Sequence, residues 1–257
     1  MSTGTAGKRL PLEAFARGLA VIQAFGAHQP SPTLSDLAKA TGLPRATVRR
    51  CVQTLVELGF AQSTGRQFSL SPKILKLGFA YLSSAPLPRV AQRYLDQISD
   101  RLNESSSVSV LEGDEIVYVA RASTTRIMAV DLSVGSRLPA FCTSMGRVLL
   151  AALPQGEVRA RMETVARRSF TPSTITSIED LLSQLELVRR QQFAVVDQEL
   201  EIGLRSIAVP VCGGGTRVVA AINVSTQAAR VSLEQLRGPV LQILRSAAAE
   251  LSASLGS

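Results

Sequence analysis

The stretch that decides the fold of the first third of this chain is GLPRATVRRCVQTLVELGF, residues 42–60. With about 3.6 residues per turn, its apolar residues fall on one side of a helix: Val48, Cys51, Val52, Leu55 and Leu58. The other side carries Arg49, Arg50 and Gln53, and no acidic residue occurs before Glu57. A soluble helix needs only a polar outer face, so a basic outer face indicates an anionic partner.

A short helix is predicted directly before this stretch. LSDLAKATG, residues 34–42, has Thr33 or Ser35 as a candidate N-cap and ends at Gly42. The turn Gly42-Leu43-Pro44 leads into the basic helix, and Pro44 suits the first helical position. Two helices joined in this way form a helix-turn-helix. Its shared core is expected to contain Leu34, Leu37, Leu43, Val48 and Val52.

The flanking segments predict a winged form of this motif. Residues 61–70, AQSTGRQFSL, alternate in two short runs around Thr64-Gly65, which indicates a hairpin. Residues 12–28 have helical periodicity, with an apolar stripe of Leu12, Phe15, Leu19, Ile22 and Phe25. We therefore predict a flexible tail over residues 1–10 and a winged helix-turn-helix DNA-binding domain over residues 11–72.

Double-stranded DNA fits the outer face of the basic helix. The major groove admits one α-helix, arginine pairs with guanine and glutamine with adenine, and small residues permit close approach. Residues near the hairpin tip can reach the backbone or the minor groove. The predicted DNA contacts are Arg45, Ala46, Thr47, Arg49, Arg50, Gln53, Thr64, Arg66 and Gln67. The alternative is an ordinary solvated helix, but the preceding helix, the turn, the hairpin and the local charge together favour DNA.

Charge and composition limit the other classes of protein. Residues 1–75 carry nine Lys or Arg and three Asp or Glu, whereas residues 76–257 carry nineteen and seventeen. No apolar run approaches the roughly 18 residues of a membrane-spanning helix, and the N-terminal residues lack the apolar segment of a signal peptide. We expect a cytoplasmic protein without membrane contact. The three cysteines form no CxxC pair, so no metal site, disulfide or cofactor is expected.

The pattern changes after PLP, residues 86–88, to strands mixed with helices. We predict a linker helix over residues 73–87 and a second domain over residues 88–257. The expected helices are 89–105, 145–153, 177–193 and 232–255. The expected strands are a pair within 107–122, a strand and loop within 126–141, a strand at 194–200, and a pair within 205–226 joined through three glycines. Hairpins with flanking helices predict an α+β fold with an antiparallel sheet.

The helix predicted at Met145 offers a site for an anion. Thr143 or Ser144 can cap it, the N–H groups of its first turn are free, and a helix N-terminus favours a carboxylate. Gly146 would let a ligand approach the backbone. The alternative is a capped helix that binds nothing.

The sequence is less consistent with two other functions, an enzyme and a basic interaction module, than with a DNA-binding regulator. An enzyme could use Cys142 or Ser144 as nucleophile with help from Asp197 or Glu199. The only histidine, His28, is expected at the end of the first helix, so such a nucleophile lacks its usual base. The nucleotide-binding and zinc-protease motifs are also missing from the sequence. A basic interaction module without a ligand does not need so large a second domain.

The chain resembles the IclR family of transcription regulators from about Phe15 to its end. The N-terminal segments that carry the resemblance are FARGLAVIQAF, LSDLAKATGLPRATVRR and LVELGF. The C-terminal ones are LPAFCTSMGRVLLA and VVDQELEIGLRSIAVPV. RIMAVDLSVGSRLPAFCTSMGRVLLAALP and LGFAYLSS are similar to the PcaR/PobR-type regulators of β-ketoadipate-pathway genes.

The resemblance implies a winged helix-turn-helix, a linker helix and a GAF-like effector domain. It implies a homodimer, which in some members pairs into a homotetramer, and a small organic acid as effector, either an aromatic acid or a ring-cleavage product. Carried over by position, the effector-binding residues are Ser144, Met145, Val196, Asp197, Ser206, Asn223 and Ser225. Pairing of Asp197 or Glu199 with Arg205 is the alternative for these acids. Many members have Ser or Thr where this chain has Pro44, so the hydroxyl that could cap the helix and contact phosphate from that position is absent here.

Overall fold

The computed structural model describes residues 12–26, 30–124 and 132–256. The chain divides into two compact units after Tyr81, within the predicted linker helix. His28, the tail at residues 1–10 and much of the strand and loop expected within 126–141 lie outside the described residues.

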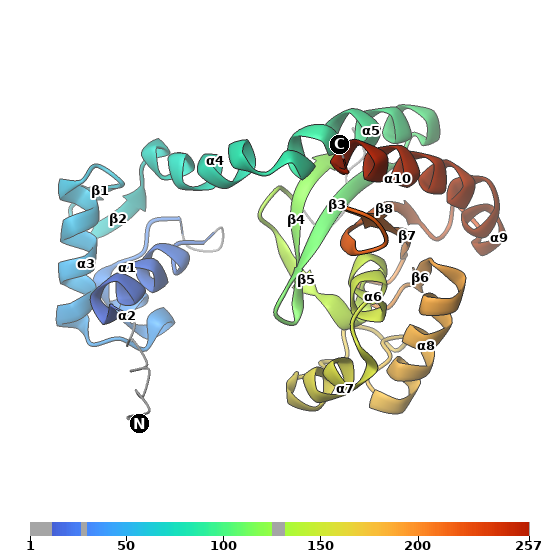
Figure 1. Ribbon diagram of the computed structural model, residues 1–257. Helices are drawn as coiled ribbons and strands as arrows, with labels where there is room; N and C mark the ends of the chain where they lie inside the picture. Colours follow the sequence, from blue (N-terminus) through green and yellow to red (C-terminus); the bar gives the residue numbers. More distant parts are fainter. Residues whose placement is uncertain (1–11, 27–29, 125–131, 257) are drawn as a thin grey trace, which may run out of the picture. The chain divides into compact units, whose positions relative to one another are not determined.

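The first unit is a three-helix motif with a two-stranded wing (Figure 1). Its elements are α1 Glu13–Gln23, α2 Leu34–Thr41, α3 Arg45–Glu57, β1 Ala61–Thr64, β2 Gln67–Leu70, a 3-10 turn Pro72–Ile74 and α4 Leu75–Ser84, which crosses the division between the units. The predicted winged helix-turn-helix is confirmed.

Local signals start and stop the helices of this motif. The Thr33 side chain accepts a hydrogen bond from Asp36 N, and the Asp36 carboxylate accepts one from Thr33 N, so the two residues form a capping box. Gly42 ends α2 with a φ of 67°, a left-handed conformation that favours glycine. Pro44 lies one position earlier than predicted, because it is the residue before α3 and Arg45 is the first helical residue.

The core of the first unit is small. It consists of Val21, Leu37, Val48, Val52, Leu55 and Ala61, with Leu34 and Leu43 packed against it. Helix α1 is shorter than the predicted 12–28, and much of its apolar stripe lies outside this core. Phe15 is 68% exposed, and Leu12 and Leu19 are also exposed. The pattern therefore predicted the helix, but much of its apolar side faces away from the core of its own unit.

The described residues of the second unit form an antiparallel sheet of six strands, in the order β5-β4-β3-β8-β7-β6, with flanking helices. The strands are β3 Ser105–Glu112, β4 Glu115–Ala122, β5 Arg137–Pro139, β6 Ala194–Asp197, β7 Leu204–Cys212 and β8 Val218–Gln227. The predicted hairpins β3-β4 and β7-β8 are both present. Strand β8 also pairs with β3, although more than 100 residues separate them in the chain, so this pairing joins the two hairpins into one sheet.

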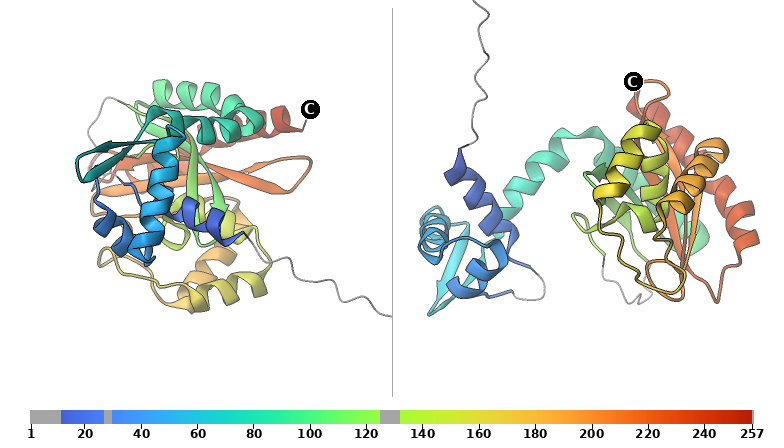
Figure 2. Two further views of the ribbon diagram at one scale, coloured as in Figure 1. Left: turned by 90° about the vertical axis from the view of Figure 1, so that its left-hand side faces the viewer. Right: turned by 90° about the horizontal axis from the view of Figure 1, so that it is seen from below.

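Helices cover both faces of this sheet (Figure 1, Figure 2). Helices α5 Pro86–Leu102 and α10 Leu241–Leu255 pack on one face, and α9 Leu233–Gln235 and a π-helical turn Leu236–Val240 precede α10. On the other face lie a 3-10 turn Ala140–Cys142, α6 Ser144–Ala151, α7 Gln155–Thr164 and α8 Ile178–Gln191. The predicted α+β fold with an antiparallel sheet is confirmed, and α7 is a helix that the periodicity did not indicate.

Candidate functional site

The predicted DNA-contacting residues divide between two sides of α3. Arg45, Arg49 and Gln53 are spaced four residues apart and line one cleft of about 620 Å³. Arg66 at the tip of the wing and Thr33 at the start of α2 line the same cleft. Gly65 turns the wing with a φ of 63°. The cleft is therefore bordered by the exposed cations of the helix and of the wing.

The charges that border this cleft are available to a partner. Within the described residues, no ion pair involves Arg45, Arg49 or Arg66, which line the cleft, and none involves Arg50 on the other side of α3. Ala46 is exposed at the start of α3, and Thr64 and Gln67 are opposite each other next to the wing turn. Unpaired guanidinium groups along a helix and its wing are suited to the phosphate backbone and to base edges.

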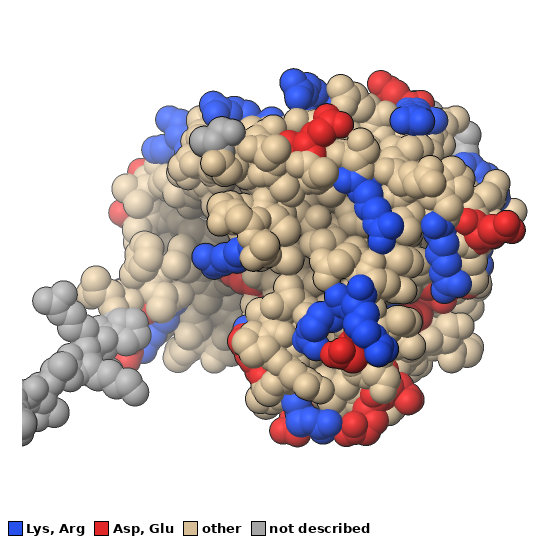
Figure 3. Space-filling view, turned by 45° about the vertical axis from the view of Figure 1, so that its right-hand side comes forward, with Lys and Arg blue, Asp and Glu red and all other residues tan. Residues whose placement is uncertain are grey.

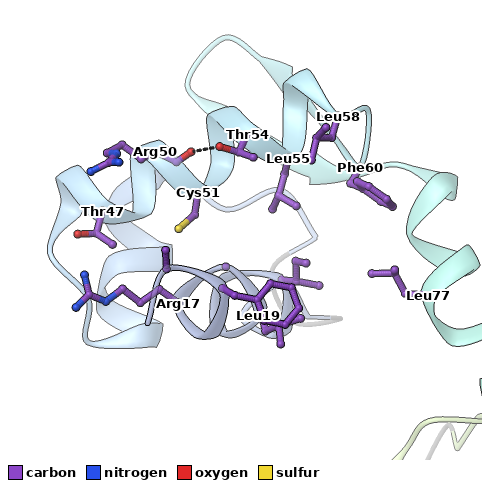
Figure 4. Close-up of a pocket in the computed structure, with 14 residues that line it drawn as sticks. Arg17, Leu19, Thr47, Arg50, Cys51, Thr54, Leu55, Leu58, Phe60 and Leu77 are labelled. Atoms are coloured by element: carbon purple, nitrogen blue, oxygen red, sulfur yellow. Dashed lines mark hydrogen bonds between the residues drawn. The ribbon is translucent and has the colours of Figure 1, made fainter. Parts of the chain in front are cut away.

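Thr47 and Arg50 lie on the other side of α3, facing α1. They line a groove of about 500 Å³ between the two helices (Figure 4). Arg17 and Arg50 lie at one end of the groove, and Phe60 and Leu77 lie at the other. The Thr54 hydroxyl donates to Arg50 O at 3.0 Å. The structure thus separates Thr47 and Arg50 from the cleft between α3 and the wing.

A second candidate site is a small cavity in the second unit, at the start of α6. The cavity has a volume of about 30 Å³. Six of the seven predicted effector-binding residues line it: Ser144, Met145, Val196, Ser206, Asn223 and Ser225. These six residues come from four elements, α6, β6, β7 and β8, which meet at this cavity.

The first turn of α6 presents unsatisfied donors at this cavity. Thr143 is the cap, because its Oγ1 accepts from Gly146 N at 3.2 Å. Within the described part of the chain, no hydrogen bond uses Ser144 N or Met145 N. The Ser144 hydroxyl and the Asn223 Oδ1 atom are buried without a hydrogen-bond partner. The Asn223 amide nitrogen donates to Ser225 Oγ at 3.1 Å.

Asp197, the seventh predicted effector-binding residue, is not among the residues that line this cavity. Its carboxylate accepts two hydrogen bonds from Arg205, at 2.7 and 3.0 Å. These bonds hold the pKa of Asp197 below its usual value. Val196 lines the cavity, and neighbouring residues of a strand point to opposite faces. The two side chains therefore cannot both face the same ligand.

Glu199 pairs with Arg147 rather than with Arg205. The Arg147 Nη2 to Glu199 Oε2 distance is 2.6 Å, and both side chains are buried, at 3% and 7% exposed. Arg147 Nε donates to Phe141 O at 3.0 Å, and Ile175 N donates to the Glu199 carboxylate at 3.1 Å. This ion pair joins α6 to the loop after β6, which supplies Leu200 to the cavity wall.

Gly146 has a packing role, contrary to the prediction that it lets a ligand approach. A Cβ atom at this position would lie 2.1 Å from Ala140 O. The helix can therefore pack against the preceding 3-10 turn only because this residue has no side chain. The close approach is to the chain's own backbone.

Several cavity residues were missed by sequence reasoning. They are Tyr118, Leu132, Leu138, Cys142, Thr143, Leu200 and Leu204. Burial raises the pKa of Tyr118 to about 12, so its hydroxyl stays protonated. Burial, and next the charge of Glu199, raise the pKa of Cys142 to about 12. Because strand pairing brings Tyr118 here, no local signal in the sequence indicated it.

The described residues contain no group of three or more His, Cys, Asp or Glu side chains that could hold a metal ion. None of their helices has the length and apolar character needed to cross a membrane.

A winged helix-turn-helix followed by a second unit with an internal polar cavity defines a class, the ligand-controlled DNA-binding regulators. The protein-family model described as "IclR helix-turn-helix domain" matches residues 14–65 of this sequence. The model described as "Bacterial transcriptional regulator IclR C-terminal" matches residues 79–253. The chain belongs to the IclR family of bacterial transcriptional regulators.

Named relatives and solved structures cover nearly the whole chain. The chain is 49% identical to the Pca regulon regulatory protein of Pseudomonas putida, over 93% of this chain and 83% of that protein. It is 35% identical to the p-hydroxybenzoate hydroxylase transcriptional activator of Acinetobacter baylyi, over 92% and 89%. The crystal structure of an IclR homolog from Microbacterium hydrocarbonoxydans, complexed with 4-hydroxybenzoate, is 27% identical with a TM-score of 0.80, over 94% and 98%.

Proposed function

We propose that this regulator controls genes of aromatic-acid catabolism, and that a small organic acid bound at the start of α6 changes its affinity for an operator in double-stranded DNA. The observation that carries this proposal is the pair of unpartnered polar atoms in the cavity, Ser144 Oγ and Asn223 Oδ1. Buried polar groups in proteins are nearly always hydrogen-bonded, so two orphans in one cavity support a polar ligand.

The α6 wall of the cavity is suited to the carboxylate of such an acid. Ser144 N and Met145 N are the free donors of a helix N-terminus, where the helix dipole favours negative charge. The Ser144 hydroxyl adds a third donor. The rest of the lining is largely apolar, which suits a ring or a short hydrocarbon chain.

The names of the relatives support the aromatic-acid class. The Acinetobacter relative is an activator named for p-hydroxybenzoate hydroxylase, and the Microbacterium homolog was crystallised with 4-hydroxybenzoate. The Pseudomonas relative is named for a Pca regulon. We propose the same class of effector for this chain, either an aromatic acid or a product of ring cleavage.

The cavity is so small that the binding of an acid must change the conformation of its walls. A volume of about 30 Å³ holds about one or two water molecules, so an acid of benzoate size requires the walls to separate. A ligand that binds one state of these walls better than the other shifts the population between them. By linkage, effector affinity and DNA affinity are then coupled in both directions.

We propose regulation by binding alone, without catalysis, in the cytoplasm. Cys142 is a protonated thiol at neutral pH, since burial and the charge of Glu199 raise its pKa to about 12. Ser144 Oγ has no hydrogen-bonded base. Neither residue is therefore activated as a nucleophile.

We propose that the protein forms homodimers, because the first unit exposes apolar side chains that a second copy can cover. Exposed apolar side chains occur on α4 as well as on α1, and Leu75, Leu77, Phe79 and Tyr81 are all exposed. Ile74, at the end of the 3-10 turn before α4, is half-buried. We propose that α1 and α4 of a second copy cover this surface, because the same chain supplies both the apolar groove of Figure 4 and apolar helices that could occupy it.

Sedimentation of the Phe79→Glu variant tests the dimer. Phe79 is 67% exposed, so the charge should not disturb the folded unit, and the variant should sediment as a monomer where the wild type is a dimer. Footprints of the wild type should show half-sites about 10–10.5 base pairs apart, or a multiple of that spacing. A wild-type protein that sediments as a monomer and tightly protects one half-site contradicts the dimer.

The effector site is tested with Ser144→Glu. The new carboxylate fills the space before α6, so the variant should keep operator binding and lose its response to the acid. Ser183→Glu, on the exposed side of α8, is the matched control and should respond normally. Titration calorimetry measures acid binding, and fluorescence anisotropy with operator DNA measures the response. Unchanged affinity for the acid in Ser144→Glu would place the effector elsewhere, because one lost charge-assisted hydrogen bond costs roughly 1.5–3 kcal/mol.

A further inference from the structure

The cavity at α6 is closed on one side by the loop between β6 and β7, residues 198–203. Leu200 of this loop lines the cavity, and Ile202 at its tip is 72% exposed. Gln198 and Gly203, at the two ends of the loop, have positive φ values of 59° and 85°. Such values cost free energy in a residue other than glycine, so Gln198 keeps its conformation only because its surroundings hold it.

The helix and sheet walls of the cavity have less room to move. Every residue of α6 is buried, and a Cβ atom at Gly146 would overlap the backbone of Ala140. Strand β8 is hydrogen-bonded to β3 on one side and to β7 on the other. An acid needs more than the present volume of about 30 Å³, and of these three walls the loop is the one that can move at least cost.

A buried ion pair holds this loop against α6. The Arg147 guanidinium donates to Glu199 Oε2 at 2.6 Å and to Phe141 O at 3.0 Å. Ile175 N donates to the same Glu199 oxygen at 3.1 Å. Neither Arg147 nor Glu199 is among the described residues that line the cavity, and Leu200 follows Glu199 directly. The pair therefore fixes Leu200 against α6 without itself meeting a ligand.

The backbone beside the pair is held by two threonines from the loop after α7. Thr174 Oγ1 donates to Glu199 O at 2.5 Å, and Thr171 Oγ1 donates to Gln198 O at 2.6 Å. Both threonines are buried. Hydrogen bonds therefore converge on one end of the loop, where the left-handed residue could relax if they were broken.

We infer that the Arg147–Glu199 ion pair is a latch that holds the cavity closed, and that its strength sets how readily an effector enters. This inference rests on the effector site proposed above and names its regulation. When the open form is a minor population, the apparent affinity for an acid is lowered by that fraction, so a weaker latch raises the affinity. A weaker latch also moves the acid-free protein toward the acid-bound form, and the operator affinity moves with it.

The latch is tested in the full-length protein with the double variant Arg147→Met/Glu199→Leu. Replacing both partners by apolar residues of similar volume leaves no unpaired charge, so the fold should be kept. Titration calorimetry with 4-hydroxybenzoate should show roughly tenfold tighter binding than in the wild type. Operator affinity without acid should move toward that of the acid-saturated wild type. Amide hydrogen exchange should become faster in residues 198–204 and stay unchanged in β8.

Matched variants separate a latch from a general loss of stability. Arg147→Lys keeps the buried cation and should keep the acid affinity within about threefold of the wild type. Arg159→Met/Glu179→Leu removes an exposed pair and should match the wild type in all three measurements. Glu199→Gln keeps the shape of the side chain and removes its charge. It replaces the double variant if that protein does not fold, and it should shift the three measurements in the same direction.

The outcomes distinguish this inference from the proposal beneath it. Unchanged acid affinity in the double variant overturns the latch and leaves the effector site in place. Weaker acid binding with faster exchange of the loop also overturns it, because the pair would then order the site instead of closing it. If the wild type does not bind 4-hydroxybenzoate, the proposed effector fails, and loop exchange with acid-free operator affinity still decides the latch. Both must change in the double variant, and a failure of either to change overturns it.

Discussion

The two units of this protein use charged side chains in opposite ways. In the first unit, the one ion pair among the described residues is Arg17 with Glu13, and the arginines of α3 and the wing are exposed. In the second unit, arginines bind carboxylates and carbonyl oxygens of their own chain, and Arg147 does so in the interior. Figure 3 shows a face of the molecule on which positive and negative side chains are interspersed.

Apolar residues follow the same division. The first unit has a core of six buried residues and leaves Phe15, Leu75 and Phe79 exposed. The second unit has large cores on both faces of its sheet. The first unit therefore leaves its arginines and part of its apolar surface exposed, whereas the second unit uses both kinds of side chain to hold its own elements together.

The largest effect is expected from breaking the interior ion pair. Arg147→Met should destabilise the second unit by roughly 3–5 kcal/mol, because it leaves Glu199 buried without its cation. Urea unfolding measures the change. Arg159→Met is the control, since its pair with Glu179 is 46% and 73% exposed, is screened by solvent and should contribute far less to stability. Equal losses in the two variants would remove the distinction between interior and surface charge.

A smaller loss is expected from filling the contact at Gly146. Gly146→Ala should cost roughly 1–3 kcal/mol, because the new methyl group overlaps the backbone at Ala140. Gly156→Ala in α7 is the control, because no atom lies within 4 Å of its Cβ position, and it should be neutral or slightly stabilising. Thermal unfolding compares them. A neutral Gly146→Ala would show that α6 can move from the 3-10 turn, and that the cavity wall is less rigid than the packing indicates.

A comparable loss, in DNA affinity rather than stability, is expected at Arg49. Arg49→Ala should weaken operator binding by roughly 1–3 kcal/mol if the residue pairs with guanine, or lower the salt slope by about 0.9 if it contacts only phosphate. Its unfolding free energy should not change, because Arg49 is exposed. Arg50→Ala should cost less, since Arg50 faces the groove with α1. Fluorescence anisotropy measures both, with Arg190→Ala on α8 as the control.

The ranking of these two arginines tests which side of α3 meets DNA. If Arg50→Ala weakens binding more than Arg49→Ala does, the cleft between α3 and the wing is not the surface that reads the operator. If neither change matters, the assignment of α3 as the recognition helix is wrong.

The smallest effect concerns Asp197 and depends on pH. Arg205 lowers the pKa of Asp197 in the folded protein. The stability from this pair is therefore complete above the ordinary aspartate value of about 3.9 and is lost as the pH falls through the lowered value. Because the Asp197 side chain is 33% exposed, Asp197→Asn should cost only about 0.2–1 kcal/mol at neutral pH. Urea unfolding should show a smaller difference in acid, and a difference independent of pH would contradict this assignment.

The helix-turn-helix could be predicted from the sequence because its signals are local. Thr33 with Asp36 starts one helix, Gly42 ends it, and the 3.6-residue period of α3 indicates which side is apolar. The α6 helix start was found in the same way, and of the two predicted caps, Thr143 and Ser144, the structure has Thr143. Helix α7 was missed because only Val158 and Met162 are buried along it, too few for a recognisable stripe.

The rest of the effector site depended on contacts between distant parts of the chain. The alternation of a strand shows that Val196 and Asp197 face opposite sides, but not which side holds the cavity. The pairing of β8 with both β3 and β7 decides that Asn223 and Ser225 meet the start of α6. Arg147 and Glu199 form an ion pair although they are 52 residues apart in the sequence, and no local pattern indicates such a pair.

The sequence by itself determined the helix-turn-helix with its wing and the helix start at α6, and its motifs carried the resemblance to the IclR family. The helices, turns and caps follow from residues within a few turns of one another, where backbone geometry and side-chain period act directly. Only the tertiary structure decided which polar atoms are buried without partners, which arginines remain unpaired and which apolar faces lack cover. These properties are set by what packs against a residue, and for β3 and β8 the packing partners are more than 100 residues apart.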